Sequence, residues 1–386
     1  MEKPTRAFGR NIILLGLVSF LNDLSSEMIF PILPMFIIEL GGAGVAIGLA
    51  GGLQESVANL LKVICGYWSD KTGRRKIFVT SGYLTSAFFK LLLAGAWAWQ
   101  QAVVLTGLER TGKGLRSAPR DAIISDSMPD RRGRGFGIHR ALDTAGAIFG
   151  SILAFVLVWK LDISLKNIIL IAAVAAFLSL IPIIFVREKR RQPSDARLRL
   201  SLRQLPGSLK TFIFAAGIFG LADITFMFFI LRAKTAFTPE WQTAGPILLY
   251  ILFNTVYAAL AVPLGILSDK IGHRNVIVGG YFVFGLMSFG FAIFSTLPAY
   301  IVLFTLYGIV KASIEGNQRA FVSDLSASEV RGTALGTYHT ITGLAALPGS
   351  VIAGLLGAAT RATFIYAGSM SFLAVIVFLV LRRRMR

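Results

Sequence analysis

Charged residues are scarce in this sequence. Asp, Glu, Lys and Arg make up 15% of its 386 residues, whereas an average soluble protein has about 25%. Apolar runs of 20 or more residues recur along the chain, and the strict apolar–polar alternation of strands is absent. Runs of that length predict membrane-spanning helices, and the missing alternation argues against a β-barrel. The composition therefore excludes a soluble globular protein.

Cysteine and histidine are also rare. The single cysteine, Cys65, excludes an intrachain disulfide. The chain contains neither the H-E-x-x-H zinc motif nor the G-x-S-x-G nucleophile motif, and its only histidines are His139, His273 and His339. The sequence therefore predicts neither an enzyme nor a bound cofactor.

Acidic residues are outnumbered, because 39 Lys and Arg stand against 20 Asp and Glu, giving a net charge of +19. An excess of basic residues is also found in nucleic-acid-binding proteins. The positions of the basic residues along the chain therefore decide whether the charge indicates nucleic-acid binding or membrane topology. If both termini are cytoplasmic, most basic residues fall in cytoplasmic segments, and the outer loops hold only Lys160, Lys166, Arg232, Lys234 and Arg361. This asymmetry follows the positive-inside rule, so the charge predicts topology and argues against a nucleic-acid partner.

The apolar runs predict twelve membrane spans. We place them at about 11–38, 45–69, 77–98, 102–124, 135–159, 164–186, 209–232, 244–268, 276–296, 299–322, 331–357 and 362–382. The basic stretch 187–208 has no apolar run long enough to cross a membrane. It is predicted to be a cytoplasmic linker between two six-helix bundles, 1–186 and 209–386.

The two halves repeat the same motifs. GYWSDKTGRRKIFVTSGY (66–83) matches LGILSDKIGHRNVIVGGY (264–281), and GAIFGSILA (146–154) matches AALPGSVIA (345–353). Duplicated bundles are typical of transporters that rock one bundle against the other around a central site. The predicted fold is an all-α integral membrane protein with two pseudo-symmetric six-helix bundles.

The segment 66–83 resembles the cytoplasmic loop motif of the major facilitator superfamily, with characteristic residues at Gly66, Asp70, Gly73 and Arg74. The second half keeps a weaker copy at Gly265, Asp269, Gly272 and Arg274. The resemblance implies the major facilitator fold, secondary active transport and a cytoplasmic charge network that Asp126 joins through Arg74.

Three further segments, FLNDLSSEMIFPILP, RTGKGLRSAPRDA and FGIHRALDTAGAIFG, are similar to a bacterial branch of this superfamily whose substrates are largely unassigned. This similarity implies a multi-pass protein of the bacterial inner membrane, and we expect a monomer with both termini in the cytoplasm.

The segment ERTGKGLRSAPRD (109–121) places charge inside a predicted span. At about 100° per residue, a stripe about 60° wide contains Glu109, Lys113, Arg116 and Arg120, with Asp121 beside it. A charge at bilayer depth costs about 2.5–3.5 kcal/mol, so these side chains should face a partner or a wet cavity. Arg116 and Arg120 need anions from elsewhere, and the candidates are the carboxylates of spans 11–38 and 135–159 or a bound substrate.

Titratable residues occur in other spans as well. Asp23 and Glu27 lie four residues apart, so either their mutual repulsion favours a proton on one of them or both are ionised and paired with basic helices. Span 135–159 adds His139, Arg140 and Asp143, and Asp223 aligns with Asp23 at an offset of 200 residues. In span 299–322, three charged residues are spaced to neutralise one another: Lys311, Glu315 and Arg319.

These residues favour a proton-coupled transporter that works by alternating access. Titration of Asp23, Glu27 or Asp143 would compete with carboxylate–arginine pairing and so free an arginine for an anionic substrate group. GAIFGSILA resembles the superfamily's exporter motif, with Ser151 in place of its usual proline. The first hypothesis is therefore efflux of a small organic molecule by antiport with protons.

Two other hypotheses remain. The arginine-rich cavity also suits import of an anionic solute, such as an organic acid, a sugar phosphate or a siderophore-like chelate. A metal-ion carrier would use Asp23, Glu27, His139 and Asp143, but the neighbouring arginines would repel a cation.

Overall fold

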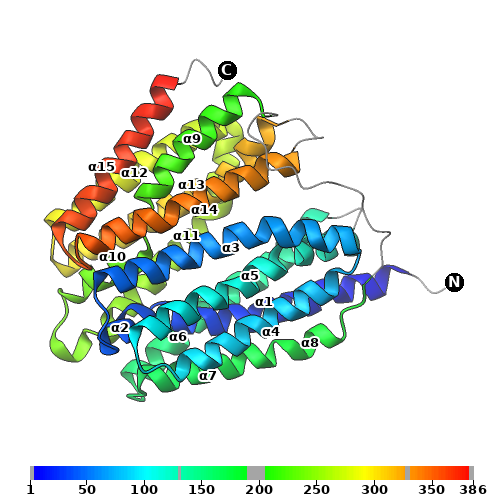
Figure 1. Cartoon of the computed structure of the whole chain (residues 1–386), viewed down its shortest axis with the longest axis horizontal. Coiled ribbons are helices and arrows are strands. Elements are labelled where there is room, and N and C mark those ends of the chain that lie inside the picture. Colours follow the sequence, from blue (N-terminus) through cyan, green and yellow to red (C-terminus); the bar gives the residue numbers. More distant parts are fainter. Residues whose placement is uncertain (1–3, 129–131, 189–204, 327–330, 382–386) are drawn as a thin grey trace. The chain divides into compact units, whose positions relative to one another are not determined.

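The structure, a computed structural model, describes residues 4–128, 132–188, 205–326 and 331–381, and these ranges are helical without any strand (Figure 1). Nine stretches of the described residues are long and apolar enough to cross a membrane. The other three predicted spans lie on helices with more polar residues: 45–69, 102–124 and 331–357. The all-α membrane fold is thereby confirmed, whereas the count of twelve spans stays a prediction.

The chain forms two compact units. Unit 1 comprises residues 1–36 and 57–198, and unit 2 comprises residues 37–56 and 199–386. Residues 37–56 thus belong to unit 2, although they precede the predicted linker. Most of that linker, 189–204, lies outside the described residues, so the division at 187–208 stays a prediction.

Unit 1 is a helical bundle. Its helices are α1 (Pro4–Ile29), α4 (Arg75–Ala94), α5 (Trp99–Ser127), α6 (Arg132–Trp159), α7 (Leu165–Leu178) and α8 (Leu180–Ile184). In it α1 packs along α6, α4 packs along α5, and α7 contacts both α1 and α4. Apolar side chains of several helices meet in a buried core that includes Leu15, Val18, Val79, Tyr83, Ile123, Ile124 and Ile183.

Two helices carry the chain across the boundary between the units. They are α2 (Leu33–Glu39) and α3 (Gly44–Thr72). The helix α3 is continuous, and its residues up to 56 belong to unit 2 while those from 57 belong to unit 1.

Unit 2 repeats the packing pattern of unit 1. Its helices are α9 (Gly207–Ala222), α10 (Phe226–Lys234), η3 (Pro239–Trp241), α11 (Ala244–Ile271), α12 (His273–Ile293), α13 (Leu297–Asp324), α14 (Arg331–Leu355) and α15 (Arg361–Val380). Here α9 packs along α14 as α1 does along α6, and α12 packs along α13 as α4 does along α5. The helix α15 contacts α9 and α12, which is the place that α7 takes in unit 1. This correspondence agrees with the repeated motifs of the sequence.

Three predicted spans are interrupted. Span 11–38 breaks into α1 and α2 at residues 30–32, where Pro31 and Pro34 disfavour a continuous helix. Span 164–186 breaks at Ser179. Span 209–232 breaks at residues 223–225, and Thr225 caps the new helix by accepting a hydrogen bond from the backbone N–H of Met227.

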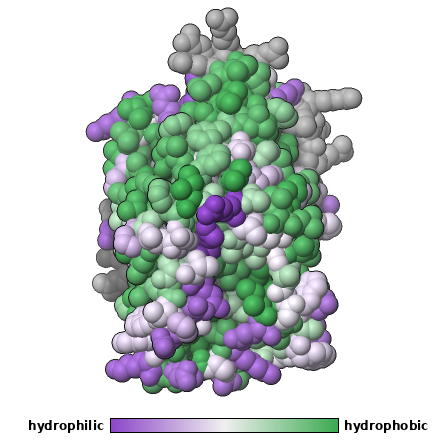
Figure 2. All heavy atoms as spheres, turned by 90° about the vertical axis from the view of Figure 1, so that its left-hand side faces the viewer, coloured by the Kyte–Doolittle hydropathy of each residue, from purple (hydrophilic) through white to green (hydrophobic). Residues whose placement is uncertain are grey.

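The outer surface is largely apolar. Exposed side chains include large hydrophobic ones such as Trp97, Phe149, Val262 and Leu355. Hydrophobic residues also cover most of the face shown in Figure 2, with hydrophilic residues in smaller groups. A soluble protein rarely exposes so much contiguous apolar surface, whereas lipid chains cover it in a membrane.

Candidate functional site

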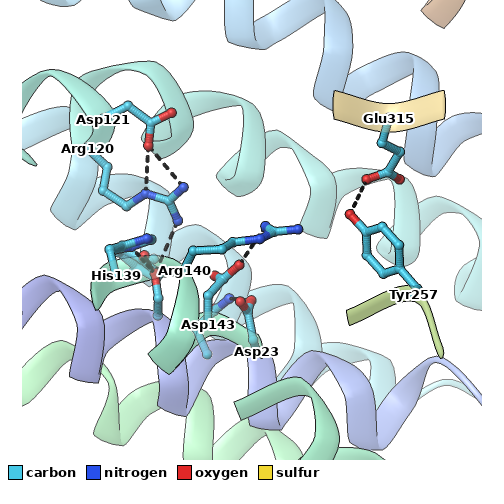
Figure 3. Close-up of polar contacts among 11 residues, drawn as sticks. Asp23, Arg120, Asp121, His139, Arg140, Asp143, Tyr257 and Glu315 are labelled. Atoms are coloured by element: carbon cyan, nitrogen blue, oxygen red, sulfur yellow. Dashed lines mark hydrogen bonds and ion pairs between the residues drawn. The ribbon is translucent and has the colours of Figure 1, made fainter. Parts of the chain in front are cut away.

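A pair of carboxyl groups lies inside unit 1. Asp23 on α1 and Asp143 on α6 lie close enough for their carboxyl groups to form a hydrogen bond. Asp143 Oδ2 also accepts a hydrogen bond from Arg140 Nη1 at 2.9 Å, and Asn22 Nδ2 donates to Asp23 Oδ1 at 3.2 Å. In Figure 3, Asp23 and Arg140 lie on either side of Asp143. The structure thus brings together three of the predicted site residues.

Glycines on α6 allow this pair to form. An added Cβ at Gly146 would stand 2.3 Å from the carbonyl oxygen of Phe20, and one at Gly150 would stand 2.3 Å from that of Leu24. The two helices therefore touch backbone to backbone, as small residues permit in membranes. Because Asp23 lies between these two α1 contacts, the close approach holds its carboxyl group against Asp143.

Ser19 joins three helices one turn before Asp23. Its Oγ lies 2.9 Å from Nε2 of His139 and 3.1 Å from the hydroxyl of Tyr83, and it accepts a hydrogen bond from Arg120 Nη1 at 3.1 Å. Arg120 in turn forms an ion pair with its neighbour Asp121, with Nη2 3.1 Å from Oδ1 (Figure 3). Arg120, Asp121 and His139 therefore form a second polar group of unit 1, beside the carboxyl pair. Ser19 was not among the predicted site residues.

Of the predicted counter-ions of the two arginines on α5, the described carboxylates of α1 and α6 form no ion pair with either, and a bound substrate stays a prediction. Arg120 takes the adjacent Asp121 in place of a carboxylate on α1 or α6. Arg116, which is 4% exposed, donates Nη1 to Ser86 Oγ at 2.7 Å, and its guanidinium carbon lies 4.5 Å from the centre of the Tyr83 ring. Among the described residues no carboxylate lies within ion-pair distance of Arg116. The physical reason is that the side chains of Arg116 and Arg120 point to different neighbouring helices, although one turn separates them.

Lys90 on α4 is a buried residue to which the sequence analysis assigned no role. It is 1% exposed, and its Nζ donates to Ser26 Oγ at 2.8 Å, to Ser25 Oγ at 3.0 Å and to the carbonyl oxygen of Asn22 at 3.4 Å. All three acceptors are on α1 and are neutral. A lone lysine in the apolar run YLTSAFFKLLLAGAW was the available signal, because charges at membrane depth mark functional or structural sites.

In unit 2, Asp223 stands at the break between α9 and α10. Both of its carboxylate oxygens accept hydrogen bonds from Lys311 Nζ, at 2.8 and 2.9 Å. Glu315 accepts a hydrogen bond from the hydroxyl of Tyr257 at 2.7 Å (Figure 3). Lys311 therefore forms an ion pair with Asp223, the residue after α9, which the sequence did not predict. Glu27 lies half-buried on α1, one turn beyond Asp23.

The first loop motif forms a charge network at the ends of α3, α4 and α5. Arg75 donates Nη2 to Asp70 and Nη1 to Asp126, each at 2.8 Å. The prediction that Arg74 pairs with Asp126 is therefore wrong by one residue. Gly73 has a φ of +65°, which favours glycine, and Arg74 precedes α4 as its N-cap, so Arg75 is the first helical residue and faces the two carboxylates.

The second loop motif repeats this arrangement with a histidine. His273 Nε2 lies 3.6 Å from Asp269 Oδ1 and 3.5 Å from Asp324 Oδ2. Gly272, with a φ of +91°, makes the corresponding turn. Arg274 lies in the first turn of α12. In the first half, Gly66 faces Ala118 of α5, where an added Cβ would meet the alanine Cβ at 3.1 Å.

A metal centre finds no support among the residues that the structure describes. No three His, Cys, Asp or Glu side chains there are grouped so that they could hold an ion. His139 bonds to Ser19, and Asp143 is engaged by Arg140.

Long apolar helices in two units of matching topology, with ionisable side chains inside unit 1, define a multi-pass membrane transport protein. The chain belongs to the Major Facilitator Superfamily, whose family model matches residues 15–246 and 212–386. Members of this family carry small molecules across membranes, which confirms the prediction that the protein is not an enzyme.

Relatives cover nearly the whole chain. An uncharacterized MFS-type transporter of Methanocaldococcus jannaschii is 50% identical over 375 residues, which are 96% of this chain and 94% of that protein. The multidrug resistance protein MdtH of Proteus mirabilis is 25% identical over 348 residues, 86% of this chain and 82% of MdtH. Among solved structures, the nucleoside transporter NupG superposes with a TM-score of 0.81 at 14% identity, over 97% of this chain and 99% of NupG. At that identity the superposition shows the fold alone.

Proposed function

We propose that this protein is a proton-coupled secondary active transporter of a small organic molecule, and that the Asp23–Asp143 pair carries the coupling proton. A hydrogen bond between two carboxyl groups requires a proton on one of them. Arg140 lies 2.9 Å from Asp143 Oδ2 and favours the ionised form of that group, so the shared proton belongs to Asp23. This carboxyl pair is the observation that carries the proposal.

Loss of the proton gives a reason for conformational change. Two ionised carboxylates in contact repel each other strongly where water is scarce. The cations whose charges act on Asp23 are on other helices of unit 1: Arg116 and Lys113 on α5, and Lys90 on α4. Deprotonated Asp23 is therefore drawn from α6 toward α5, and the two protonation states favour different packings of α1. A proton that binds the two packings differently can drive alternating access.

The loop networks complete the proposal as a cytoplasmic gate. In the first half this gate comprises Gly66, Asp70, Gly73, Arg74 and Asp126, with Arg75 added by its contacts. In the second half it comprises Asp269 and Arg274, with His273 added. The carboxylates of Asp70, Asp269 and Asp324 are exposed, and exposed ion pairs contribute about 0.2–1 kcal/mol each, so such a gate can open without a large cost.

Direction and surroundings are also part of the proposal. The similarity to MdtH and the exporter-like segment 146–154 support efflux by antiport in the bacterial inner membrane, by a monomer with both termini in the cytoplasm. A second candidate, import of an anionic solute, is supported by the absence of a carboxylate partner for Arg116 among the described residues. Of the two candidates, the geometry favours the second.

Reconstituted vesicles test the coupling. Purified protein would be placed in liposomes with a trapped pH-sensitive dye, and proton flux would be followed on addition of citrate, glycerol phosphate or ethidium. We expect Asp23→Asn to abolish proton-driven accumulation while keeping substrate exchange, because the amide mimics the protonated acid. Asp162→Asn is the matched control, since Asp162 is an exposed loop residue whose φ of +46° suits asparagine.

Two results would contradict the proposal. One is proton-driven accumulation by Asp23→Asn at the wild-type level and pH dependence. The other is accumulation by the wild type that ignores an imposed pH gradient. The sign of the response separates the two directions, because symport and antiport accumulate substrate under opposite pH gradients.

A further inference from the structure

Two buried cations of unit 1, Lys90 and Arg116, differ from three arginines of the same unit in their partners. Three arginines have an ion pair within their own helix: Arg110 with Glu109, Arg120 with Asp121, and Arg140 with Asp143. Arg116 and Lys90 contact only neutral groups among the residues that the structure describes. An unpaired buried charge is costly, so a site that keeps two of them is suited to an anion from outside the chain.

Lys90 and Arg116 differ in how many N–H donors they have left for a ligand. Lys90 has three N–H donors, and three oxygens of α1 accept from it. Arg116 has five N–H donors in a planar fork and gives one, from Nη1, to Ser86. Lys90 can therefore add only its charge, whereas Arg116 can also bind a ligand directly.

Tyr83 and Ser86 hold the Arg116 fork from α4. The guanidinium lies 4.5 Å from the Tyr83 ring centre, an arrangement that favours stacking, and Ser86 fixes one nitrogen at 2.7 Å. Ser86 Oγ itself donates to the carbonyl oxygen of Glu109 at 3.1 Å, so its position is fixed too. Tyr83, Ser86 and Lys90 share one face of α4, because they are spaced by three and four residues. This face of α4 and Arg116 form a buried, positively charged cluster.

We propose that Arg116 binds an organic anion, through a carboxylate or phosphate group, and that this anion and the proton on Asp23 bind together. The second part rests on the proposed function, since it uses the same proton. Two internal carboxylates carry a charge that acts on Arg116: Glu109, which is paired with Arg110, and ionised Asp23, which would compete with the substrate. A protonated Asp23 leaves Arg116 to the substrate. Proton and anion are therefore carried in the same direction.

The groups around Asp23 support this coupling. Those that face it from the packed helices are Asp143 on α6, Arg116 and Lys113 on α5, and Lys90 on α4. Arg140 is engaged with Asp143. A bound anion at Arg116 removes part of the positive field that favours ionised Asp23, so it favours the protonated form. By reciprocity, the proton raises the affinity for the anion by the same factor.

Binding to the purified full-length protein tests the inference without requiring transport. The probes are citrate, benzoate and inorganic phosphate, with ethidium as the cationic comparison, and the readout is the thermal midpoint at about pH 5.5 and about pH 7.5. We expect an anion to stabilise the wild type, with an affinity that falls by up to about tenfold per pH unit where Asp23 loses its proton. Arg116→Gln should weaken binding about 10- to 100-fold.

Two further variants keep the test decisive. Arg116→Lys retains the charge but not the planar fork, so it should keep part of the stabilisation by the anion. This variant also replaces Arg116→Gln in the test if Arg116→Gln fails to fold. Arg319→Gln, an exposed arginine of α13 whose Nε bonds to the carbonyl oxygen of Glu315, is the matched control and should bind as the wild type does. The inference is overturned by any of three results: no shift with any anion, equal anion binding in both Arg116 variants and the wild type, or tighter binding at the higher pH.

The outcome is separable from that of the proposed function. If Asp23→Asn keeps proton-driven accumulation while Arg116→Gln loses the anion, the assignment of the coupling proton to Asp23 fails and the anion site stands. If proton coupling is found and ethidium alone stabilises the protein, the anion site fails and the coupling stands.

Discussion

The contact between α1 and α6 makes a sharp prediction for Gly146→Ala. A methyl group at Gly146 would stand 2.3 Å from the carbonyl oxygen of Phe20 and 2.8 Å from its Cα. Both atoms belong to the backbone, so no side-chain rotation can relieve the clash. The two helices must separate or one must bend.

The size of the effect follows from that distance. Ordinary van der Waals contact begins at 3.4 Å, so the added carbon is about 1 Å too close. Overpacking of this kind costs about 1–3 kcal/mol. An alanine in a helix gains about 0.8–1.0 kcal/mol over glycine, which offsets part of that cost. The net effect is measured against Gly137→Ala on the same helix, because that site has nothing within 4 Å and gains the same helix propensity.

The measurement is thermal unfolding of the purified protein in detergent. We expect the midpoint of Gly146→Ala to lie about 2–10 °C below that of Gly137→Ala. Since Phe20 and Gly146 each lie three residues from a member of the Asp23–Asp143 pair, proton-driven accumulation should fall as well. Equal midpoints for the two alanine variants would refute the backbone contact between α1 and α6.

Two more predictions concern ion pairs. Arg75→Gln should lower the thermal midpoint more than Arg74→Gln does, because Arg75 forms ion pairs with Asp70 and Asp126 at 2.8 Å. Equal midpoints for the two variants would mean that Arg75 is not the main cation of this network. Asp223→Asn should destabilise unit 2 by about 1–3 kcal/mol, since it leaves the half-buried Lys311 without its carboxylate. The double variant Asp223→Asn/Lys311→Met should recover most of that loss in denaturation, and failure to recover would mean that the pair is not the source.

Much of the fold follows from the sequence alone. Apolar length and the spacing of repeated motifs predict the helices and their duplication, because a membrane forces the backbone to satisfy its own hydrogen bonds. Helix breaks were predictable where proline stands, at residues 31 and 34. The break at 223–225 has no proline, and its only local signal is Thr225, a good N-cap.

The partners of the charged residues were harder to predict. Arg140 and Asp143 lie three residues apart on one helix, a spacing at which helical side chains meet. Helical spacing could not choose a carboxylate partner for Arg116 or Arg120, because a long arginine side chain reaches several positions. The rotation of α5 about its axis relative to α4 decides which partner each arginine meets. The role of Arg75 was not predicted, and the reason lies in the backbone. The turn at Gly73 leaves Arg74 outside α4, which begins at Arg75.

The ion pairs of Arg110, Arg120 and Arg140 each join residues of a single helix, and this bears on the speed of the transport cycle. Such a pair travels with its helix, so sliding one helix past another leaves both charges compensated. The links between α1 and its neighbours through Ser19, Ser25 and Ser26 include hydrogen bonds that neutral serine oxygens accept from Arg120 and Lys90. Such a hydrogen bond contributes about 1.5–3 kcal/mol, against about 3–5 kcal/mol for opening a buried ion pair between helices. At about 1.4 kcal/mol per factor of ten, keeping a buried pair such as Glu109–Arg110 within one helix spares the rearrangement a slowdown of roughly tenfold.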